Sequence, residues 1–484
     1  MSYLRKFGMQ PTTELMEEIS KVVNHPARSF IAHIDREELV DDLARLVSYP
    51  SCSFEGFDIQ PSLECAAEVA RMVEAVGFAD VELIDVGGRA PVVWAEHRAD
   101  ETRYPDAPTL LLYAHYDVQP APVQEQGWRT DPYVLTKGGD GRYYGRGAAD
   151  DKSGIVAHLH AIDSAGGLEA LDYVNLKICF EGEEECLGTL EEYVATDPQR
   201  FAADAYLIFD LGNIEVGKPM LTSALRGTVI VDVEVAALRQ EIHSGVFGGP
   251  APDALKALIM LLATLWDAHG NTVIEGISDF EWTGGSYPEE LFRRDVGLVE
   301  GADLVGTGSI ENRLFSRPSA SIIGLDATPV AQSSNVVIPR AKARVSVRFP
   351  HGQTAAMVTE AVITHLTAHA PAGVVVTFPY TLEAGAFAAH DEGNLYTLFA
   401  RAMSEVFGVK TQVMGSGASI PLVAALQKIS PQADIMLYGA SDLGQSNIHG
   451  GNESVDLSEL VNMIKSEALF LHYLRPDTDD IIIP

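Results

Sequence analysis

A histidine and an aspartate two residues apart stand at the polar end of a long apolar run. The run covers residues 110–114, and His115 and Asp117 follow it. Such a run predicts a buried strand, and residues two apart on a strand point to the same side. An imidazole backed by a carboxylate that orients it suits a metal site, although the same pair also occurs as a structural hydrogen bond. The pair gains weight because further acidic or histidine clusters follow it.

Two of these clusters are rich in carboxylates. Asp150 and Asp151 precede a predicted helix and follow the glycine-rich segment 144–147, which lets backbone approach a site closely. Two aspartates at this position could also simply cap the helix. Farther on, residues 183–185 are three glutamates that follow an apolar strand at 174–180. Adjacent carboxylates repel one another unless they are solvated or share a cation, and one can ligate that cation while its neighbour serves as a general base.

Two isolated polar residues complete the set. Asp210 closes an apolar strand predicted at 206–209, and His449 lies in the polar loop 446–453. A lone histidine in such a loop is usually a surface residue. If these residues gather around metal ions, however, each ion would have one histidine and several carboxylate oxygens as ligands. Such a ligand set suits zinc, cobalt or manganese.

Helices and strands alternate around these residues in the first part of the chain. Helical spacing occurs at 13–23, 36–47, 61–76 and 153–164, and strand patterns occur at 81–84, 91–95, 109–113, 174–180 and 206–209. This alternation predicts an α/β sandwich with a mainly parallel or mixed sheet. Near the end of the chain, helices are again predicted, at 395–407 and 457–473, as in the first part.

The pattern between residues 226 and 380 is different. Strands are predicted at 227–236, 321–323, 341–349 and 374–378, with helices at 251–269 and 355–368. Two helices on one face of a four-stranded antiparallel sheet are the economical arrangement for such a segment. We therefore expect residues 226–380 to form a domain inserted into a parent domain made of residues 1–225 and 381–484.

Composition limits the classes of protein that this chain can belong to. Its 484 residues are 46% hydrophobic, and 34 Lys and Arg stand against 68 Asp and Glu, for a net charge of −34. That length indicates more than one core, and that charge disfavours nucleic acid and anionic membrane as partners. No apolar stretch approaches the roughly 18 residues of a membrane span. With no signal-peptide pattern and no metal-binding spacing among the four cysteines, a cytoplasmic protein is expected.

Together, the motifs resemble the carnosinase/aminoacylase-type family of dinuclear zinc metallopeptidases. H-x-D on a strand, G-R-G-x-x-D-D-K, E-G-x-E-E, a strand-terminal aspartate and a late histidine occur in the family's order over nearly the whole chain. The resemblance implies a zinc-peptidase-like catalytic α/β/α sandwich with an inserted α+β lid domain that usually dimerises. The segment 226–380 falls where that lid should be.

Carried over position by position, the resemblance assigns roles to the clusters. It implies two metal ions that share one bridging ligand, Asp150. One ion would also be bound by His115 and Asp210, and the other by Glu185 and His449. Asp117 would orient His115, and Glu184 would be the general base that deprotonates a water shared by the two metals and passes the proton to the leaving nitrogen. Because Glu183 lengthens the glutamate run, a one-residue ambiguity remains in this assignment.

The resemblance extends to the inserted segment. His243 resembles a lid histidine that reaches into the partner subunit's site and steadies the oxyanion, and Arg348 resembles the arginine that grips the substrate's carboxylate. Gly417 and Ser419 belong to a loop that resembles the family's substrate-side loop, with Ala418 in place of a glycine. On their own, His243 could cap a loop and Arg348 could pair with a surface acid.

The resemblance favours a dipeptidase whose substrate carries a free amino terminus and a free carboxylate. It implies two divalent ions, with zinc expected first and manganese or cobalt as alternatives, and a homodimer formed through the lid. An aminoacylase, a carboxypeptidase or an N-acyl-diamino-acid deacylase of the same family would share the metal site and remains an alternative. A catalytically silent scaffold is disfavoured because every expected ligand and the base are present. Nucleic-acid binding is disfavoured because no basic stripe occurs.

Overall fold

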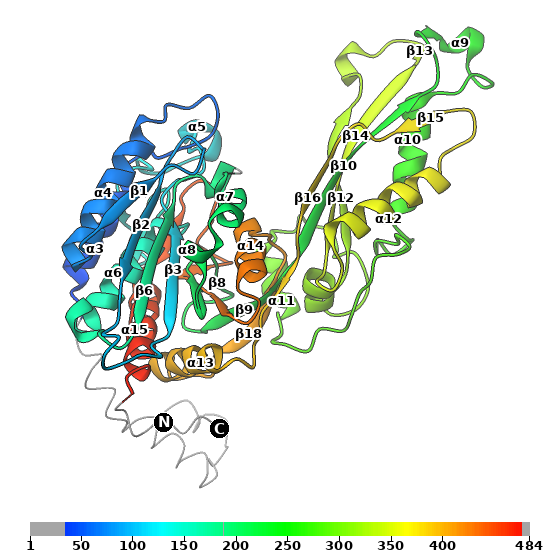
Figure 1. The fold of residues 1–484 in the computed structure, drawn as a ribbon. Coiled ribbons are helices and arrows are strands. Elements are labelled where there is room, and N and C mark those ends of the chain that lie inside the picture. Colours follow the sequence, from blue (N-terminus) through cyan, green and yellow to red (C-terminus); the bar gives the residue numbers. More distant parts are fainter. Residues whose placement is uncertain (1–33, 187, 477–484) are drawn as a thin grey trace, which may run out of the picture. The chain divides into compact units, whose positions relative to one another are not determined.

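The chain divides into two compact units (Figure 1), which we describe separately. The computed structural model describes residues 34–186 and 188–476, so the helix predicted at 13–23 lies outside the described residues. The first unit is formed by Met1–Leu221, His390–Gln412 and Ala425–Pro484, and the second by Thr222–Ala389 and Val413–Ala424. The segment 226–380 falls inside the second unit, whereas the return of residues 413–424 to that unit was not anticipated.

The first unit contains most of the helices and strands that the sequence predicts. Its helices are α3 (Arg36–Val47), α4 (Gln60–Val76), α5 (Val123–Gln126), α6 (Lys152–Ser164), α7 (Leu190–Thr196), α8 (Pro198–Phe201), α13 (Asn394–Phe407) and α15 (Leu457–Tyr473). Its strands are β1 (Val81–Ile84), β2 (Val92–His97), β3 (Thr109–His115), β4 (Thr136–Lys137), β5 (Arg142–Tyr144), β6 (Asn175–Glu181), β7 (Ala205–Ile208), β8 (Gly212–Asn213), β19 (Asp434–Leu437), β20 (Ser441–Asp442) and β21 (Ser454–Asp456). Where an element was predicted, its bounds differ from the observed ones by only a few residues. The elements that were not predicted from the sequence are α5, α7, α8, β4, β5, β8, β19, β20 and β21.

A mixed sheet forms the centre of this unit. The strand order is β1-β2-β6-β3-β7-β19, in which β6, β3, β7 and β19 run parallel while β1 and β2 are antiparallel to their neighbours. Helix α4 packs on β1 and β2, α6 on β3 and α13 on β19, while α15 lies against α6. Strand β3 is almost wholly buried, which explains why its sequence is a continuous apolar run rather than an alternating one. The predicted α/β class with a mixed sheet is confirmed.

The register of the parallel strands sets up the functional site. His115 pairs with Glu181 across β3 and β6, and Tyr113 pairs with Ile208 across β3 and β7. Asp210 is two residues beyond Ile208, as His115 is two residues beyond Tyr113. These polar residues therefore all emerge at the carboxyl edge of the sheet, which is where open α/β sheets place their ligands.

The second unit is built around long antiparallel strands. It contains α9 (Ser244–Phe247), α10 (Ala254–Leu262), α11 (Glu289–Asp295), α12 (Ala355–Ala368), β10 (Gly227–Ala236), β11 (Ile242–His243), β12 (Ser319–Asp326), β13 (Val336–Val337), β14 (Arg340–Phe349), β15 (Val375–Thr377), β16 (Thr381–Ala384) and β17 (Phe387–Ala388). Three further elements, β9 (Met220–Leu225), β18 (Gln412–Ser416) and α14 (Pro421–Ile429), lie where the chain passes from one unit to the other.

The main sheet of the second unit has five strands in the order β12-β14-β10-β15, with β16 also paired to β10. The prediction of four strands was wrong, because β10 is long enough to pair with β16 near its start and with β15 near its end. Alternate valines of β10 and β14 are buried in one core with leucines of α10. The helix predicted at 251–269 is shorter than expected, because Trp266 adopts an extended backbone with φ −127° and ψ 149° after a brief 3-10 turn.

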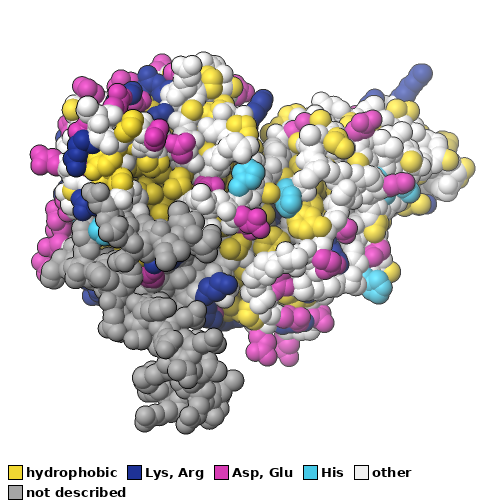
Figure 2. All heavy atoms as spheres, turned by 60° about the horizontal axis from the view of Figure 1, so that its bottom comes forward, with side chains coloured by type: hydrophobic (Ala, Val, Ile, Leu, Met, Phe, Trp, Pro, Cys, Tyr) yellow, Lys and Arg dark blue, Asp and Glu magenta, His cyan; other side chains and the backbone are white. Residues whose placement is uncertain are grey.

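Charge is spread rather than concentrated on the face shown in Figure 2. Asp and Glu side chains are scattered over that face among Lys and Arg side chains, and no continuous basic stripe crosses it. None of the helices in the described part of the chain combines the length and apolar character that crossing a bilayer requires.

Candidate metal centre

Five predicted ligands form two clusters that share one aspartate. One cluster contains His115, Asp150 and Asp210, the other contains Asp150, Glu185 and His449, and within each cluster the ligand atoms lie within 4.8 Å of one another. Asp150 directs one carboxylate oxygen to each side. Its Oδ1 lies 3.0 Å from Nε2 of His115, and its Oδ2 lies 3.1 Å from Nε2 of His449. This geometry suits a carboxylate that bridges two ions.

The remaining ligands complete the two clusters. Asp210 Oδ1 lies 3.6 Å from Nε2 of His115, and Glu185 Oε2 lies 3.1 Å from Nε2 of His449. The His115 side chain is fully buried, whereas that of His449 is 54% exposed. One cluster is therefore set deep at the end of β3, and the other opens towards solvent.

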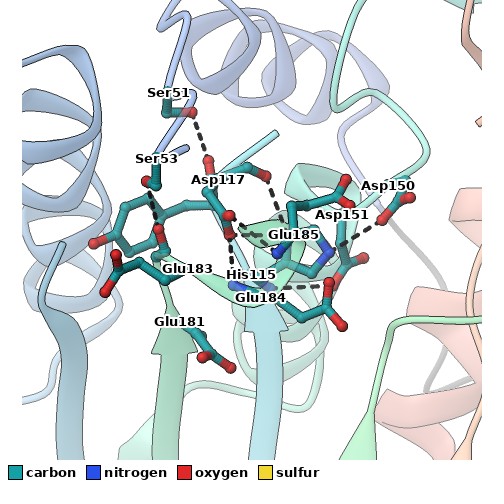
Figure 3. Close-up of polar contacts among 12 residues, drawn as sticks. Ser51, Ser53, His115, Asp117, Asp150, Asp151, Glu181, Glu183, Glu184 and Glu185 are labelled. Carbon is teal, nitrogen blue, oxygen red and sulfur yellow. Dashed lines mark hydrogen bonds and ion pairs between the residues drawn. The ribbon is translucent and has the colours of Figure 1, made fainter. Parts of the chain in front are cut away.

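Asp117 connects the two sides of the site. Nδ1 of His115 lies 3.1 Å from the backbone oxygen of Asp117 and 3.4 Å from its Oδ1, so the backbone as well as the carboxylate fixes the imidazole. The same carboxylate accepts hydrogen bonds from the backbone N–H groups of Glu184 and Glu185, both at 3.1 Å. Figure 3 shows Asp117 between His115 and the glutamate segment. Asp117 thus positions both the buried ligand and the turn that carries the predicted base.

The three consecutive glutamates point in different directions (Figure 3). Glu183 is buried and faces away from the clusters, where its Oε2 accepts a hydrogen bond of 2.8 Å from the backbone N–H of Arg89. Glu185 belongs to a metal-ligand cluster, and its Oε2 also accepts from the side-chain amide of Gln119 at 2.8 Å. Glu184 remains as the carboxylate available for proton transfer, which supports the predicted register of the three residues.

Burial and mutual repulsion dominate the electrostatics of these acids. Burial, followed by the charge of Asp210, raises the pKa of Glu184 well above its ordinary value. Burial also raises the pKa of Asp210 to about 6, although its contact with His115 opposes the shift. Burial would raise the pKa of Asp150 as well, but hydrogen bonds with His115 and His449 outweigh it and lower that pKa. A carboxylate in the position of Glu184 accepts a proton readily.

The two histidines respond to the same acids. Burial opposes the charged form of His115, yet hydrogen bonds with Asp117, Asp150 and Asp210 raise its pKa well above the ordinary value. Hydrogen bonds with Asp150 and Glu185 raise the pKa of His449 to about 10. Both imidazoles are therefore surrounded by negative charge, which is the environment that a bound cation requires.

The donor set fits two divalent ions. No Lys or Arg side chain forms an ion pair with Asp150, Glu185 or Asp210 in the described residues. Histidine nitrogens combined with carboxylate oxygens are ligands that zinc, manganese and cobalt accept. Two nearby cations repel each other, and three carboxylates provide the negative charge that offsets this repulsion.

A buried ion pair connects the loops that carry Asp150 and His449. Arg146 and Glu453 are at most 1% exposed and pair at 2.6 Å. The Glu453 carboxylate also accepts from the backbone N–H groups of Gly147, Ala149 and Asp150, at 2.9 to 3.1 Å. Arg146 in turn donates to the backbone oxygen of Gly450, next to His449. Antiparallel pairing of β5 with β21 brings these loops together.

Three predicted substrate-side residues lie together in the second unit. Arg348 donates to Oγ of Ser419 at 2.8 Å. A Cβ atom at Gly417 would lie 2.7 Å from the guanidinium of Arg226, so only glycine fits there without a shift.

The predicted lid histidine has a different setting. His243 is exposed at the end of β11, and its Nδ1 accepts a hydrogen bond of 3.1 Å from the backbone N–H of Gly245. Within the chain, His243 therefore caps a local turn, as the alternative interpretation expected. Its Nε2 has no hydrogen-bond partner in the described residues.

Several residues that support the site were not identified from sequence. Gln119 gave no signal at all, because an isolated glutamine has no diagnostic spacing. Arg146 and Glu453 lie inside the two quoted motifs, but nothing in either motif indicated that they pair. Asp151, predicted as a possible helix cap, makes no side-chain capping bond, and its Oδ2 instead accepts from the backbone N–H of His115 at 3.2 Å.

Comparisons with known proteins agree with this geometry. The model of peptidase family M20/M25/M40 matches residues 111–473. A cysteinylglycine-S-conjugate dipeptidase of Corynebacterium striatum is 37% identical over 448 residues, which cover 90% of this chain and 95% of that protein. A β-Ala-His dipeptidase of Rattus norvegicus is 29% identical, with 90% and 93% of the two chains covered.

Solved structures show the same fold. The dipeptidase Dug1p of Saccharomyces cerevisiae superposes with a TM-score of 0.76 at 24% identity, covering 94% of this chain and all of that one. Human carnosine dipeptidase 1 superposes with a TM-score of 0.73 at 27% identity, covering 96% and 99% of the two chains. The predicted membership is confirmed: the chain belongs to peptidase family M20/M25/M40 and is a metal-dependent peptidase.

Proposed function

We propose that the protein is a dipeptidase that cleaves the peptide bond of dipeptides carrying a free amino terminus and a free carboxylate. The observation that carries this proposal is the pair of clusters joined by Asp150, next to a buried Glu184 that is not itself a member of either cluster. The proposal is supported by relatives named as dipeptidases over nearly the whole chain.

Each residue has a defined part in the proposed reaction. His115 and Asp210 would hold one divalent ion, Glu185 and His449 the other, and Asp150 would bridge them, with zinc expected first. When bound, such ions lower the pKa of a water and polarise the scissile carbonyl. Glu184 takes the proton from the attacking water and delivers it to the leaving nitrogen. Asp117 keeps His115 and the backbone at Glu184 in place.

The second unit would supply substrate recognition. Arg348 and Ser419 would bind the substrate's carboxylate, with Gly417 allowing the loop to approach closely. His243 would steady the oxyanion that forms as water attacks the carbonyl. To act on a substrate bound by another subunit, a histidine needs an exposed side chain with a ring nitrogen that is not already used, and Nε2 of His243 meets this requirement in the described residues.

A homodimer formed through the second unit is part of the proposal. Strand β12 lies at the edge of its sheet, and Ile322, Ile323 and Leu325 on it are 41%, 56% and 49% exposed. Ile259 and Met260 of α10 are also more than half exposed. An open sheet edge and exposed apolar side chains favour pairing with a second copy of the chain.

The test of the proposed function is hydrolysis of a substrate panel by the metal-loaded protein. The panel contains Cys-Gly, Ala-Ala and β-Ala-His, a tripeptide, N-acetyl amino acids and N-succinyl-diaminopimelate. Cleavage confined to dipeptides, lost on chelation and restored by zinc or manganese, is the expected result. Cleavage of acylated amino acids alone would replace the proposal by an aminoacylase or deacylase activity at the same metal site.

A further inference from the structure

One buried arginine in the second unit has no acidic partner among residues 34–186 and 188–476. Arg142, Arg146 and Arg226 are buried among the described residues. Arg142 pairs with Asp442 at 2.8 Å and Arg146 pairs with Glu453 at 2.6 Å. Arg226 is 8% exposed, forms no ion pair within the described part of the chain, and leaves its Nε without a hydrogen-bond partner.

The side-chain contacts of Arg226 place it beside the predicted carboxylate-binding loop. It donates to Oγ of Ser319 at 2.9 Å, and Ser319 pairs with Arg348 across β12 and β14. Its guanidinium also lies against Gly417, since a Cβ added there would be 2.7 Å from its terminal nitrogen. Arg226 and Arg348 are near enough for the charge of Arg348, after burial, to lower the pKa of Arg226 to about 10.

Neutral hydroxyl groups hold this pair of arginines in place. Ser419 receives a hydrogen bond from Arg348, contacts Oγ1 of Thr228 at 2.9 Å, and donates to the backbone oxygen of Arg226. None of these groups carries a negative charge. Burying one guanidinium beside another without a counter-ion is unfavourable, so an anion that binds both would be held strongly.

We propose that Arg226 and Arg348 together form an anion site, and that Arg226 is a second arginine that recognises the carboxylate of the substrate. This inference rests on the proposed dipeptidase function and deepens it. A carboxylate has two oxygens, and one guanidinium for each oxygen would make a free carboxylate a strict requirement rather than a preference. Substrates in which that group is amidated would lose both charged contacts.

Steady-state kinetics of a dipeptide and its C-terminal amide test this inference. The native enzyme and the variants Arg226→Met and Arg226→Lys are compared on the dipeptide of the panel that is cleaved fastest. Arg226→Met is expected to raise the KM for the dipeptide by roughly tenfold or more, while leaving the poor cleavage of the amide unchanged. Arg226→Lys keeps a positive charge in the site and should recover part of the loss.

Arg340→Gln is the matched control, because Arg340 is an exposed arginine on β14, the strand of Arg348, and already pairs with Glu234 at 3.0 Å. It should leave both substrates unaffected. Equal loss of activity on dipeptide and amide in Arg226→Met and Arg226→Lys would show that Arg226 is only structural. Equal cleavage of dipeptide and amide by the native enzyme would show that no carboxylate is recognised.

A binding measurement separates this inference from the proposed function. Sulfate should raise the unfolding temperature of the metal-loaded native protein more than that of Arg226→Lys, at matched ionic strength. This readout needs no hydrolysis, so it still decides on the anion site if the panel reveals no dipeptidase. The same shift in both proteins would overturn the inference even if dipeptides are cleaved.

Discussion

The two units contain unneutralised charge of opposite sign. In the first unit, Asp150, Glu185 and Asp210 gather around two histidines without a Lys or Arg partner in the described residues. In the second unit, Arg226 and Arg348 lie close together, and neither forms an ion pair with an acid that the structure describes. Where the fold holds like charges together, we expect a bound ligand to supply the opposite charge. The carboxylates of the first unit would bind cations, and the arginines of the second unit would bind an anion.

Paired charges in the same units make the contrast clear. Arg146 with Glu453 in the first unit, and Asp232 with Arg344 in the second, each find their counter-charge inside the chain. Such pairs hold loops and strands in place and need no ligand. Burial alone therefore does not distinguish a binding group from a structural one. The charged groups proposed to bind ligands also lack an internal counter-charge in the part of the chain that the structure describes.

The largest effect on turnover should come from replacing the proposed general base while leaving all the proposed metal ligands unchanged. Glu184→Gln should lower kcat by about 10²–10⁴-fold, since a positioned proton acceptor typically contributes that much. Metal content, measured by atomic emission, should stay near that of the native protein because Glu184 belongs to neither cluster.

Glu183→Gln is the matched control for the base, since Glu183 contacts the backbone of Arg89 instead of the clusters. It should retain most of the turnover. If Glu183→Gln abolished turnover and Glu184→Gln did not, the assignment of these two residues would be off by one position.

A smaller effect is expected from weakening the ion pair that supports the acidic site. Glu453→Gln should reduce metal affinity by about 10–100-fold, as is typical for groups that orient ligands. The change removes the charge that holds Arg146 and the loop before Asp150. Competition with a fluorescent chelator would measure the affinity.

Glu467→Gln provides the comparison for a buried glutamate away from the ligands. Glu467 is fully buried and contacts His158 and Tyr438. The Glu467→Gln variant should be less stable than the native protein but should bind metal with the same affinity. An equal loss of affinity in both variants would mean that Glu453 acts only through general stability.

The next effect concerns a histidine of the second unit. His243→Asn should lower kcat by roughly tenfold, because a hydrogen-bond donor to the developing oxyanion is lost. If His243 acts across subunits, mixing this variant with Glu184→Gln should restore activity in hybrid dimers, up to about a quarter of the native value for free exchange of two subunits.

Two results would contradict this role of His243. No recovery in the mixture, under conditions where light scattering shows dimers and labelled subunits exchange, would place His243 within its own subunit. A fully active monomer would exclude a role across subunits altogether.

The smallest effect should come from a charge that is already paired. The hydrogen bond with Arg344 lowers the pKa of Asp232 to about 2, so its contribution to stability is complete above the ordinary value of 3.8 and is lost as pH falls towards 2. Asp232→Asn should cost about 1 kcal/mol at neutral pH, a modest figure because Arg344 and Lys342 are partly exposed.

Urea unfolding of the native protein and of Asp232→Asn would measure this difference at several pH values. The difference should narrow as the pH falls from about 4 to about 2. Asp326→Asn, at an exposed position on β12 of the same sheet, is the control and should show no such change. A difference that stayed constant with pH would show that Asp232 contributes by packing and not by charge.

The residues proposed as metal ligands were easier to identify from the sequence than the groups that support them. His115, Asp150, Glu185 and Asp210 each follow or precede a strand or helix with a clear pattern, so their positions can be read from the sequence. His449 lies in a polar loop, and only the family resemblance assigned it as a metal ligand. Gln119 and Glu453 act through contacts between segments distant in sequence, which spacing does not reveal. Arg226 was used only to mark a change of pattern, because its missing partner is a property of three-dimensional packing.

The same limit explains the differences in the second unit. The alternation in β10 and β14 predicted both strands nearly to the residue. The number of strands was wrong because nothing in the sequence shows that the first half of β10 pairs with a further short strand, β16. Short strands are determined by their neighbours more than by their own composition.

The connection between Arg146 and Glu453 bears on how the protein is made. Asp150 lies in the first third of the chain and His449 near its end, so a ribosome has almost finished before both loops exist. Until then Arg146 lacks its partner Glu453, and the second cluster has Asp150 and Glu185 but not His449. A chain that ends before His449 would therefore complete only one of the two proposed metal sites, and loading of the second site would report that synthesis and folding are complete.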